Sequence, residues 1–274
     1  MTDCKSSPRM SKREHGFTLL EIAIVLVVLG LIAGGLVGPL ASQIEVRARR
    51  ETEARLADIQ AALYGFALAE GRLPCPDTDG DGLSNPRFDP TLPDSGRCTQ
   101  STGMLPYSEL GIGERDGWGH HYTYAVTHPD FTRPDNDDLC NGGNADGPHF
   151  DLCTRGRLVV RSRGDAPATR NVIEGKAELT TWAVALPAVV VSHGPNGAGA
   201  TRASGTTLPI DLQTDEGENA DGDGIFFSRT ASEGAATCRD DSDESTPLCA
   251  FDDQVVWVVP TILHARMVGA GRLP

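Results

Sequence analysis

The feature that most constrains this chain is a run of twenty residues without a charge, from Ile22 to Ala41, rich in Ile, Val, Leu and Gly. As an α-helix, such a run is long enough to cross the roughly 30 Å hydrocarbon core of a bilayer. One carboxylate, Glu21, stands directly before it. A carboxylate in a membrane helix costs about 2.5–3.5 kcal/mol, and such residues usually have a function. The run therefore predicts a membrane anchor, and it raises the question of what Glu21 pairs with.

The charges before this run predict its orientation. The sixteen residues before Phe17 carry four basic and two acidic side chains, and an excess of Lys and Arg marks the cytoplasmic side of a membrane helix. Everything after Ala41 is then exported. Ordinary signal cleavage is the alternative, but the stretch LVGPLASQIEV offers only a weak small-residue site between Leu40 and Ser42.

The residues HGFTLLE resemble the class III leader of type IV pilins and type II secretion pseudopilins. In that family an inner-membrane prepilin peptidase cleaves after a glycine and methylates the new terminal phenylalanine. The resemblance implies cleavage after Gly16 and methylation of Phe17. It also implies that Glu21 neutralises the terminal amine of a neighbouring subunit in a filament, because two buried charges are tolerated as a pair. A plain single-span anchor with an incidental glutamate is the alternative.

The helix is expected to continue beyond the membrane segment. From Leu40 to Glu70 there is no proline and no strand-like alternation, and Gly71 and Pro74 then end the pattern. Apolar residues recur there at helical spacing: Ile44, Ala48, Leu56, Ile59, Leu63, Phe66 and Leu68. We therefore divide the chain into a leader (1–16), the transmembrane half of a helix (17–41), its exported half (42–70) and a periplasmic β-rich domain (71–274).

Four further motifs occur in the order seen in the major pseudopilin of type II secretion: GRLP, DGWGHHYTYAV, VVVSHGPNGAG and DDQVVWVV. The resemblance implies an α+β fold in which the long helix packs on an antiparallel sheet. Alternation of Trp118, His120, Tyr122 and Tyr124 predicts a strand there, with His120 and His121 on opposite faces. Long insertions and a final segment typical of a short helix, PTILHARMVGAGRLP, favour a minor or specialised subunit over the major one.

The cysteines fit an oxidising compartment. Of the seven, Cys4 leaves with the leader, and six remain. Six cysteines allow fifteen pairings, but they occur as three local couples that bracket acidic or Pro/Gly-rich loops. We expect the disulfides Cys75–Cys98, Cys140–Cys153 and Cys238–Cys249. Each would contribute about 2–4 kcal/mol by restricting its loop.

Two places favour calcium. In DTDGDGLSN, the residues Asp77, Asp79, Asp81 and Asn85 have the spacing of oxygen ligands in a calcium loop, although Phe88 stands where a bidentate Glu is usual. A solvated Asp/Gly turn is the alternative. NADGDG, from Asn219 to Gly224, repeats the spacing more weakly. The resemblance to the major pseudopilin implies a second site at Asp252 and Asp253 with the turn Ser192–Gly197.

The charge of the chain argues against nucleic acid as a general partner. Its formal net charge is −14, and loss of the leader, with four basic and two acidic residues, makes it −16. One basic segment, RGRLVVRSRG, places four arginines on one face of a predicted strand: Arg155, Arg157, Arg161 and Arg163. We interpret them as a candidate docking stripe for an acidic partner, or for DNA in an uptake pilus; a solvated face paired with nearby carboxylates is the alternative.

These patterns favour a structural subunit rather than an enzyme. Ser192 and His193 are adjacent, with no third partner and no nucleophile-elbow motif, so a turn is the simpler interpretation. The partners implied are prepilin peptidase, other pilin-like subunits and an inner-membrane assembly platform, with no small-molecule substrate. We expect a single-pass inner-membrane protein of a Gram-negative bacterium, with its globular part in the periplasm. The alternatives are a minor type IV pilus subunit for adhesion or DNA uptake, and a membrane-tethered periplasmic calcium-dependent binding protein or enzyme.

Overall fold

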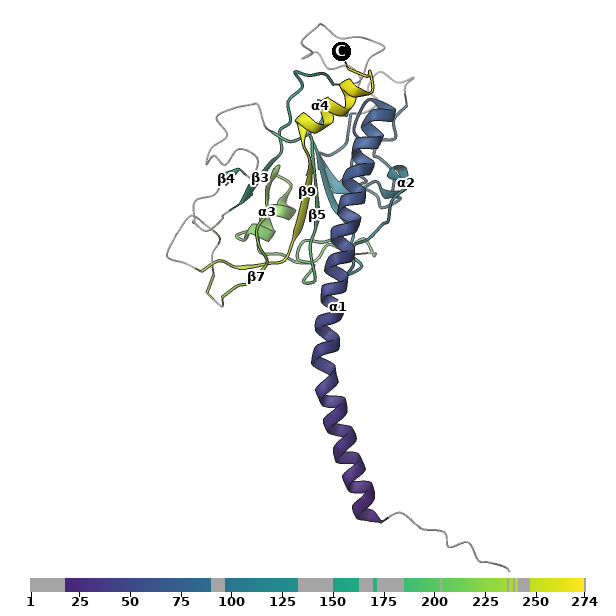
Figure 1. Cartoon of the computed structure of the whole chain (residues 1–274). Coiled ribbons are helices and arrows are strands. Elements are labelled where there is room, and N and C mark those ends of the chain that lie inside the picture. Colours follow the sequence, from purple (N-terminus) through teal and green to yellow (C-terminus); the bar gives the residue numbers. More distant parts are fainter. Residues whose placement is uncertain are drawn as a thin grey trace, which may run out of the picture. The chain divides into compact units, whose positions relative to one another are not determined.

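The computed structural model describes residues 18–89, 97–132, 150–162, 170–171, 185–202, 204–235, 237–238, 240 and 247–273, without the side chains of 33–41 and 170–171. The chain divides into two compact units, Met1–Val46 and Arg47–Pro274. Helix α1, Leu19–Glu70, runs through both (Figure 1). The helix ends at Glu70, as expected. Gly71 adopts φ +73°, and its N–H donates to the Ala67 carbonyl (2.9 Å), which terminates the helix.

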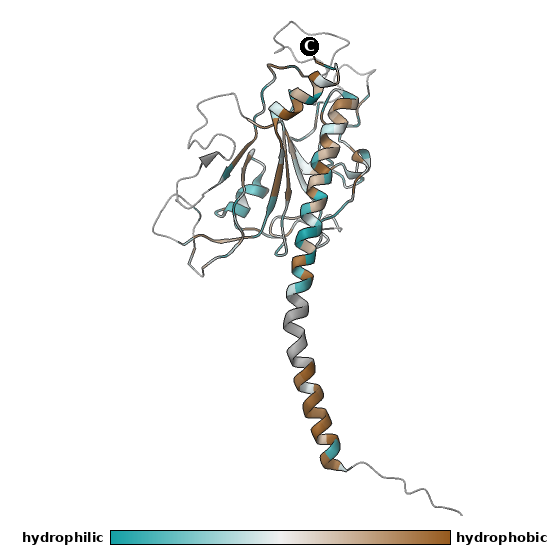
Figure 2. Cartoon of the chain, in the orientation of Figure 1, coloured by the Kyte–Doolittle hydropathy of each residue, from teal (hydrophilic) through white to brown (hydrophobic). Residues whose placement is uncertain are grey.

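In the first unit, α1 carries large apolar side chains that are exposed all round, such as Leu19 (92% exposed) and Leu31 (72% exposed). Figure 2 shows this as an almost unbroken hydrophobic stretch at the start of the helix. Over the described side chains, which leave out those of 33–41, no helix meets the length and apolarity required to span a membrane.

In the second unit, α1 has the expected apolar stripe on one face. Leu56, Ile59 and Leu63 are each 2% exposed or less and belong to the main core. Ile44, the first residue of the expected stripe, lies in the first unit instead and is 70% exposed. Polar contacts fix the same stretch of helix: Tyr64 Oη accepts from the N–H of Val259 (2.9 Å). This part of α1 is thus tied to the sheet by packing and by hydrogen bonds.

The sheet under α1 has four antiparallel strands in the order β1-β2-β5-β9. Their bounds are Thr102–Met104 (β1), Thr123–Val126 (β2), Ala188–Ser192 (β5) and Gln254–Val258 (β9). The central strand, β5, is buried along its whole length. Ala188 and Val190 pack in the core with α1, while Val189 and Val191 face a second core. Its apolar AVVVS sequence, without polar alternation, reflects burial on both faces.

A smaller sheet, in the order β4-β3-β6, accompanies the second core. Its strands are β3 (Val159–Ser162), β4 (Arg170–Asn171) and β6 (Ile225–Phe227). The β3–β6 pair is parallel, so the expectation of a purely antiparallel domain was wrong in this layer. The reason is that β6 belongs to the long segment after β5 and reaches β3 by a crossover rather than a hairpin.

Short elements complete the fold: α2 (Tyr107–Leu110), α3 (Asp215–Asp221), β7 (Ser232–Glu233), β8 (Ala250–Phe251) and α4 (Pro260–Gly269). The α4 helix is the short C-terminal helix expected from the sequence. Its Leu263 and Met267 are fully buried in the core that α1 shares. Mixed helices and sheets confirm the α+β class.

The strand expected around Trp118 is a turn instead. Asp116 Oδ1 accepts from the N–H groups of Trp118 and His120 (both 2.9 Å), and Gly119 adopts φ +90°. The alternating aromatic pattern was misleading because this carboxylate organises the backbone, and β2 begins only at Thr123.

Two of the expected disulfides, Cys75–Cys98 and Cys238–Cys249, are present. Cys153 is disulfide-bonded too, and its expected partner Cys140 lies outside the described residues.

Candidate functional site

The start of α1 holds the residues that the leader motif singles out. The N–H of Thr18 donates to Glu21 Oε2 (3.4 Å), and the N–H of Glu21 donates to Thr18 Oγ1 (3.2 Å). This reciprocal pair is a capping box, which satisfies backbone donors that a helix start leaves free. Glu21 therefore has a partner in its own chain. Gly16 and Phe17 lie outside the described residues, and the pairing of Glu21 with a neighbouring subunit stays a prediction.

A cluster of three carboxylates forms where β8 leads into β9. Asp252 and Asp253 connect these strands, and Glu216 joins them from α3. Each residue offers one oxygen, and the three oxygens lie within 4.8 Å of one another. Two oxygens that each lie about 2.4 Å from a Ca²⁺ ion can be at most about 4.8 Å apart. The spacing therefore allows one cation to contact all three residues, which we call the Glu216 cluster.

Burial distinguishes the Glu216 cluster from a surface acidic patch. Glu216 is 5% and Asp253 is 6% exposed. The Oδ1 atoms of Asp252 and Asp253 are buried and accept no hydrogen bond from any described residue. Such unpaired buried oxygens cost free energy. A divalent cation would supply the missing partner.

The same burial alters the acidity of the cluster. It raises the pKa of Asp252 to about 7, with further contributions from the Glu216 and Asp253 carboxylates. Burial also raises the pKa of Glu216, and the charge of Asp253 adds to this. Without a cation, the cluster therefore holds negative charge that opposes folding at neutral pH.

The turn after β5 contacts the cluster, as the resemblance implied. Asn196 Nδ2 donates to both carboxylate oxygens of Glu216 (3.1 and 3.0 Å), and the N–H of Asp252 donates to Glu216 Oε1 (2.8 Å). Gly194 adopts φ +55°, and a Cβ there would lie 2.0 Å from Asp252 Oδ1. The backbone of the turn can approach Asp252 this closely only because position 194 is glycine.

Ser192 and His193 have separate partners and do not form a nucleophile–base pair. Ser192 Oγ donates to Asp116 Oδ2 (2.7 Å). His193 is fully buried; its Nε2 lies 2.8 Å from Thr123 Oγ1, and its Nδ1 lies 3.7 Å from Asp253 Oδ2. The imidazole thus borders the Glu216 cluster.

The DTDGDGLSN loop also gathers its carboxylates, since Asp77, Asp79 and Asp81 each place an oxygen within 4.8 Å of the others. Asp77 is fully buried, but both of its oxygens accept backbone N–H groups at 2.7–3.0 Å, from Asp79, Gly80 and Gly82. The fourth expected ligand, Asn85, accepts from the Thr78 N–H (2.6 Å). The loop is therefore ordered by its own Asx turns, and calcium there stays a prediction.

A third acidic group, Glu218, Asp221 and Asp223, corresponds to the weaker NADGDG repeat. It is intermediate to exposed in burial, and Asp223 Oδ1 accepts from the Ile225 N–H (2.7 Å). It therefore lacks the buried unpaired oxygens of the Glu216 cluster.

The arginine stripe does not form as expected. The strand begins at Val159, so Arg155 and Arg157 precede it and share no strand face with Arg161. Arg157 pairs with Asp130 (2.9 Å), and Arg163 lies outside the described residues. The periodicity was misleading because the chain before Val159 is irregular. A docking role for these arginines stays a prediction.

Sequence reasoning missed two features. The Thr18–Glu21 capping box had a signal, because threonine followed three residues later by glutamate is typical of a helix start. Glu216 had none, since it lies 36 residues before Asp252 in a segment without a recognisable motif.

Comparisons with known proteins agree with the leader motif. The prokaryotic N-terminal methylation motif matches residues 11–37. Over 113 residues, which are 41% of this chain and 69% of the relative, the sequence is 29% identical to the type II secretion system core protein G of Dickeya chrysanthemi. No solved structure matches the chain. The methylation motif and the similarity to this secretion protein both support the resemblance of the chain to the type IV pilin-like family, which includes the pseudopilins.

Proposed function

We propose that the chain is a structural subunit, minor or specialised, of a type II secretion pseudopilus or a related filament. The observation that carries this proposal is the methylation motif at residues 11–37, which includes the exposed apolar start of α1. An apolar helix that no other described residue covers needs lipid or other subunits to cover it. The 29% identity to a secretion-system core protein supports the secretion branch of the family.

In this proposal, residues 17–41 span the inner membrane and the domain after them lies in the periplasm. Prepilin peptidase removes residues 1–16, and the assembly platform then transfers the subunit into the filament. Glu21 would give up its capping contact with Thr18 to face the amine of a neighbour. The role is architectural, and we assign no catalytic residue.

We further propose that the Glu216 cluster binds calcium. Its carboxylates are hard oxygen ligands at compatible spacing, and two buried oxygens lack a partner among the described residues. Calcium would offset most of the negative charge of the cluster and hold the β8–β9 connection against α3. Magnesium is a poorer fit, because its smaller shell demands stricter octahedral geometry.

Mass spectrometry of the mature chain tests the filament proposal. The expected product begins with a methylated Phe17. A mature chain that starts near Ser42, or one that retains Met1, would overturn it. Gly16→Ala tests the same step, because it should leave the leader attached.

A minor type IV pilus subunit is the second candidate, because the methylation motif does not distinguish secretion from pilus systems. Deletion of the gene separates the two. Loss of secreted enzymes supports the secretion filament, whereas loss of surface motility or DNA uptake with normal secretion supports the pilus.

A further inference from the structure

Glu216 lies on α3, a helix that is too short to be stable by itself. Helix α3 has only seven residues, from Asp215 to Asp221, and helices this short are unstable without tertiary support. Its own cap is Thr214, whose hydroxyl accepts from the Gly217 N–H (3.0 Å). The position of the Glu216 carboxylate therefore depends on what holds the start of α3.

A buried arginine holds the start of α3 from one side. Arg229 Nε donates to Asp215 Oδ2 (2.7 Å), and an η nitrogen of Arg229 lies 3.6 Å from Asp240 Oδ2. The side chains of Asp215 and Asp240 are 0% and 1% exposed, and that of Arg229 is 6% exposed. The guanidinium also stacks 4.5 Å from the Phe251 ring, directly before Asp252. Charge-assisted bonds of this kind are strong when buried.

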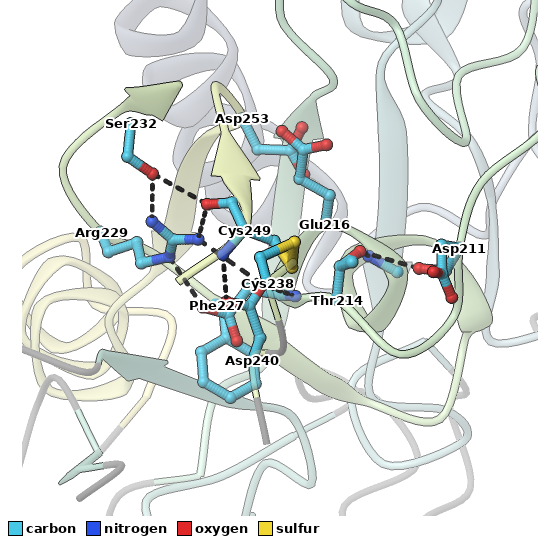
Figure 3. Close-up of polar contacts among 12 residues, drawn as sticks. Asp211, Thr214, Glu216, Phe227, Arg229, Ser232, Cys238, Asp240, Cys249 and Asp253 are labelled. Carbon is cyan, nitrogen blue, oxygen red and sulfur yellow. Dashed lines mark hydrogen bonds and ion pairs between the residues drawn. A yellow bond between two sulfur atoms is a disulfide. The ribbon is translucent and has the colours of Figure 1, made fainter. Parts of the chain in front are cut away.

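Asp240 links this arrangement to a disulfide. It lies inside the loop closed by Cys238 and Cys249, and its two oxygens accept from the N–H groups of Asp215 (2.9 Å) and Cys249 (2.8 Å). Arg229 also donates to the Cys249 carbonyl (3.0 Å). Figure 3 shows the disulfide, Asp240 and Arg229 beside the start of α3, with Glu216 and Asp253 nearby.

We propose that the Cys238–Cys249 disulfide, acting through Asp240 and Arg229, holds Glu216 in the cation site, so that calcium affinity depends on the oxidised state of this disulfide. The inference rests on the proposed calcium role of the Glu216 cluster. Asp240 and Arg229 are positioning residues here, because both act on α3 and neither offers an oxygen to the cluster.

Reduction by a dithiol would release the restraint. The disulfide accepts two electrons and two protons, it becomes two thiols, and the dithiol becomes a disulfide. Without the cross-link, holding Asp240 against the start of α3 costs more conformational entropy, so this contact becomes weaker. Loss of an outer partner that orients a metal ligand lowers metal affinity about 10–100-fold.

The test is calcium titration of the purified full chain in detergent, by calorimetry, with melting temperatures in calcium and in chelator. Two variants remove the restraint: Cys238→Ser with Cys249→Ser, and Asp240→Asn, which keeps the disulfide but cannot accept both N–H groups. Asp211→Asn is the matched control, because it removes one exposed negative charge from the turn before α3. Glu216→Gln reports on the cation site itself.

We expect at least tenfold weaker calcium binding in both restraint variants and less than twofold change in Asp211→Asn. If the disulfide and Asp240 only stabilise the fold, each restraint variant should melt lower by the same amount in calcium and in chelator, with the calcium-dependent rise unchanged. That result would overturn the inference. Normal affinity in either folded restraint variant, with weakened binding in Glu216→Gln, would also overturn it while the calcium site stands. A wild-type chain that binds no calcium would refute both. If the double serine variant does not fold, the calcium affinity of Asp240→Asn tests the inference.

Discussion

Replacing Glu216 by glutamine should change stability in opposite directions with and without calcium. The substitution removes one charge from the cluster and keeps an oxygen for the Asp252 N–H, which now donates to Glu216 Oε1. In chelator the variant should be more stable than the wild type, because two repelling carboxylates remain instead of three. In calcium it should be less stable, because one ligand charge is missing.

The structure sets the scale of both effects. A pKa for Asp252 raised from 3.8 to about 7 would correspond to about 4 kcal/mol in a fully buried site. Asp252 is only partly buried, so screening reduces this to about 2 kcal/mol, and Glu216, the second cause after burial, contributes only a part of it. The expected gain in chelator is therefore about 0.5–1 kcal/mol, or about 1–4 °C in melting temperature. At a calcium concentration of about 100 times Kd, wild type should gain about 2.7 kcal/mol, which the variant largely loses.

Differential scanning calorimetry at pH 8, in millimolar calcium and in chelator, measures both effects. Glu218→Gln is the matched control, because it also removes one charge from α3, two residues after Glu216. Glu218 belongs to the group with Asp221 and Asp223, which has no buried unpaired oxygens. It should keep the calcium-dependent rise. If Glu216→Gln retains the full rise, or if it melts lower than wild type in chelator, the assignment of the cluster is wrong.

Three further predictions concern assembly, pH and packing. The variant Glu21→Leu should insert into the membrane yet fail to cross-link into filaments. Glu21→Gln can keep the Thr18 capping contacts but not the charge, so it should fail as well. Normal assembly of Glu21→Gln would mean that Glu21 acts in capping alone. In chelator, the melting temperature should fall as pH rises from 5 to 8, because the folded-state pKa of Asp252, about 7, exceeds its unfolded value of 3.8. The stability that comes from protonated Asp252 is fully present below the unfolded pKa and is lost as pH rises through the folded pKa. A melting temperature that rises over this range would contradict the burial of this carboxylate. Leu63 is 1% exposed, so Leu63→Ala should lower the free energy of unfolding by about 2–5 kcal/mol, as measured by denaturant titration. The control Glu53→Ala, at an exposed position of the same helix, should lower it by less than about 0.5 kcal/mol. Equal losses would refute the packing of α1.

Local patterns were sufficient for much of this protein. The leader motif, the end of α1 near Glu70, the short C-terminal helix and two disulfide pairs all followed from residues close together in the chain. The calcium candidates Asp252 and Asp253, with the turn at Ser192, followed from resemblance, and the structure brings these residues together. Errors arose where a side chain overrode a local pattern, as Asp116 did by turning the chain at Trp118.

By itself, the sequence determined the elements whose causes are local: helical periodicity, capping at Thr18, glycine at the end of α1, and cysteines near their partners. Only the tertiary structure decided which distant groups share one site. Glu216 reaches Asp252 because Arg229 and Asp240 hold α3 beside the β8–β9 connection, and β5 is buried on both faces because a second sheet covers the first. Such pairings depend on long-range packing and on the cost of leaving buried charges unpaired, and neither quantity appears in any short stretch of residues.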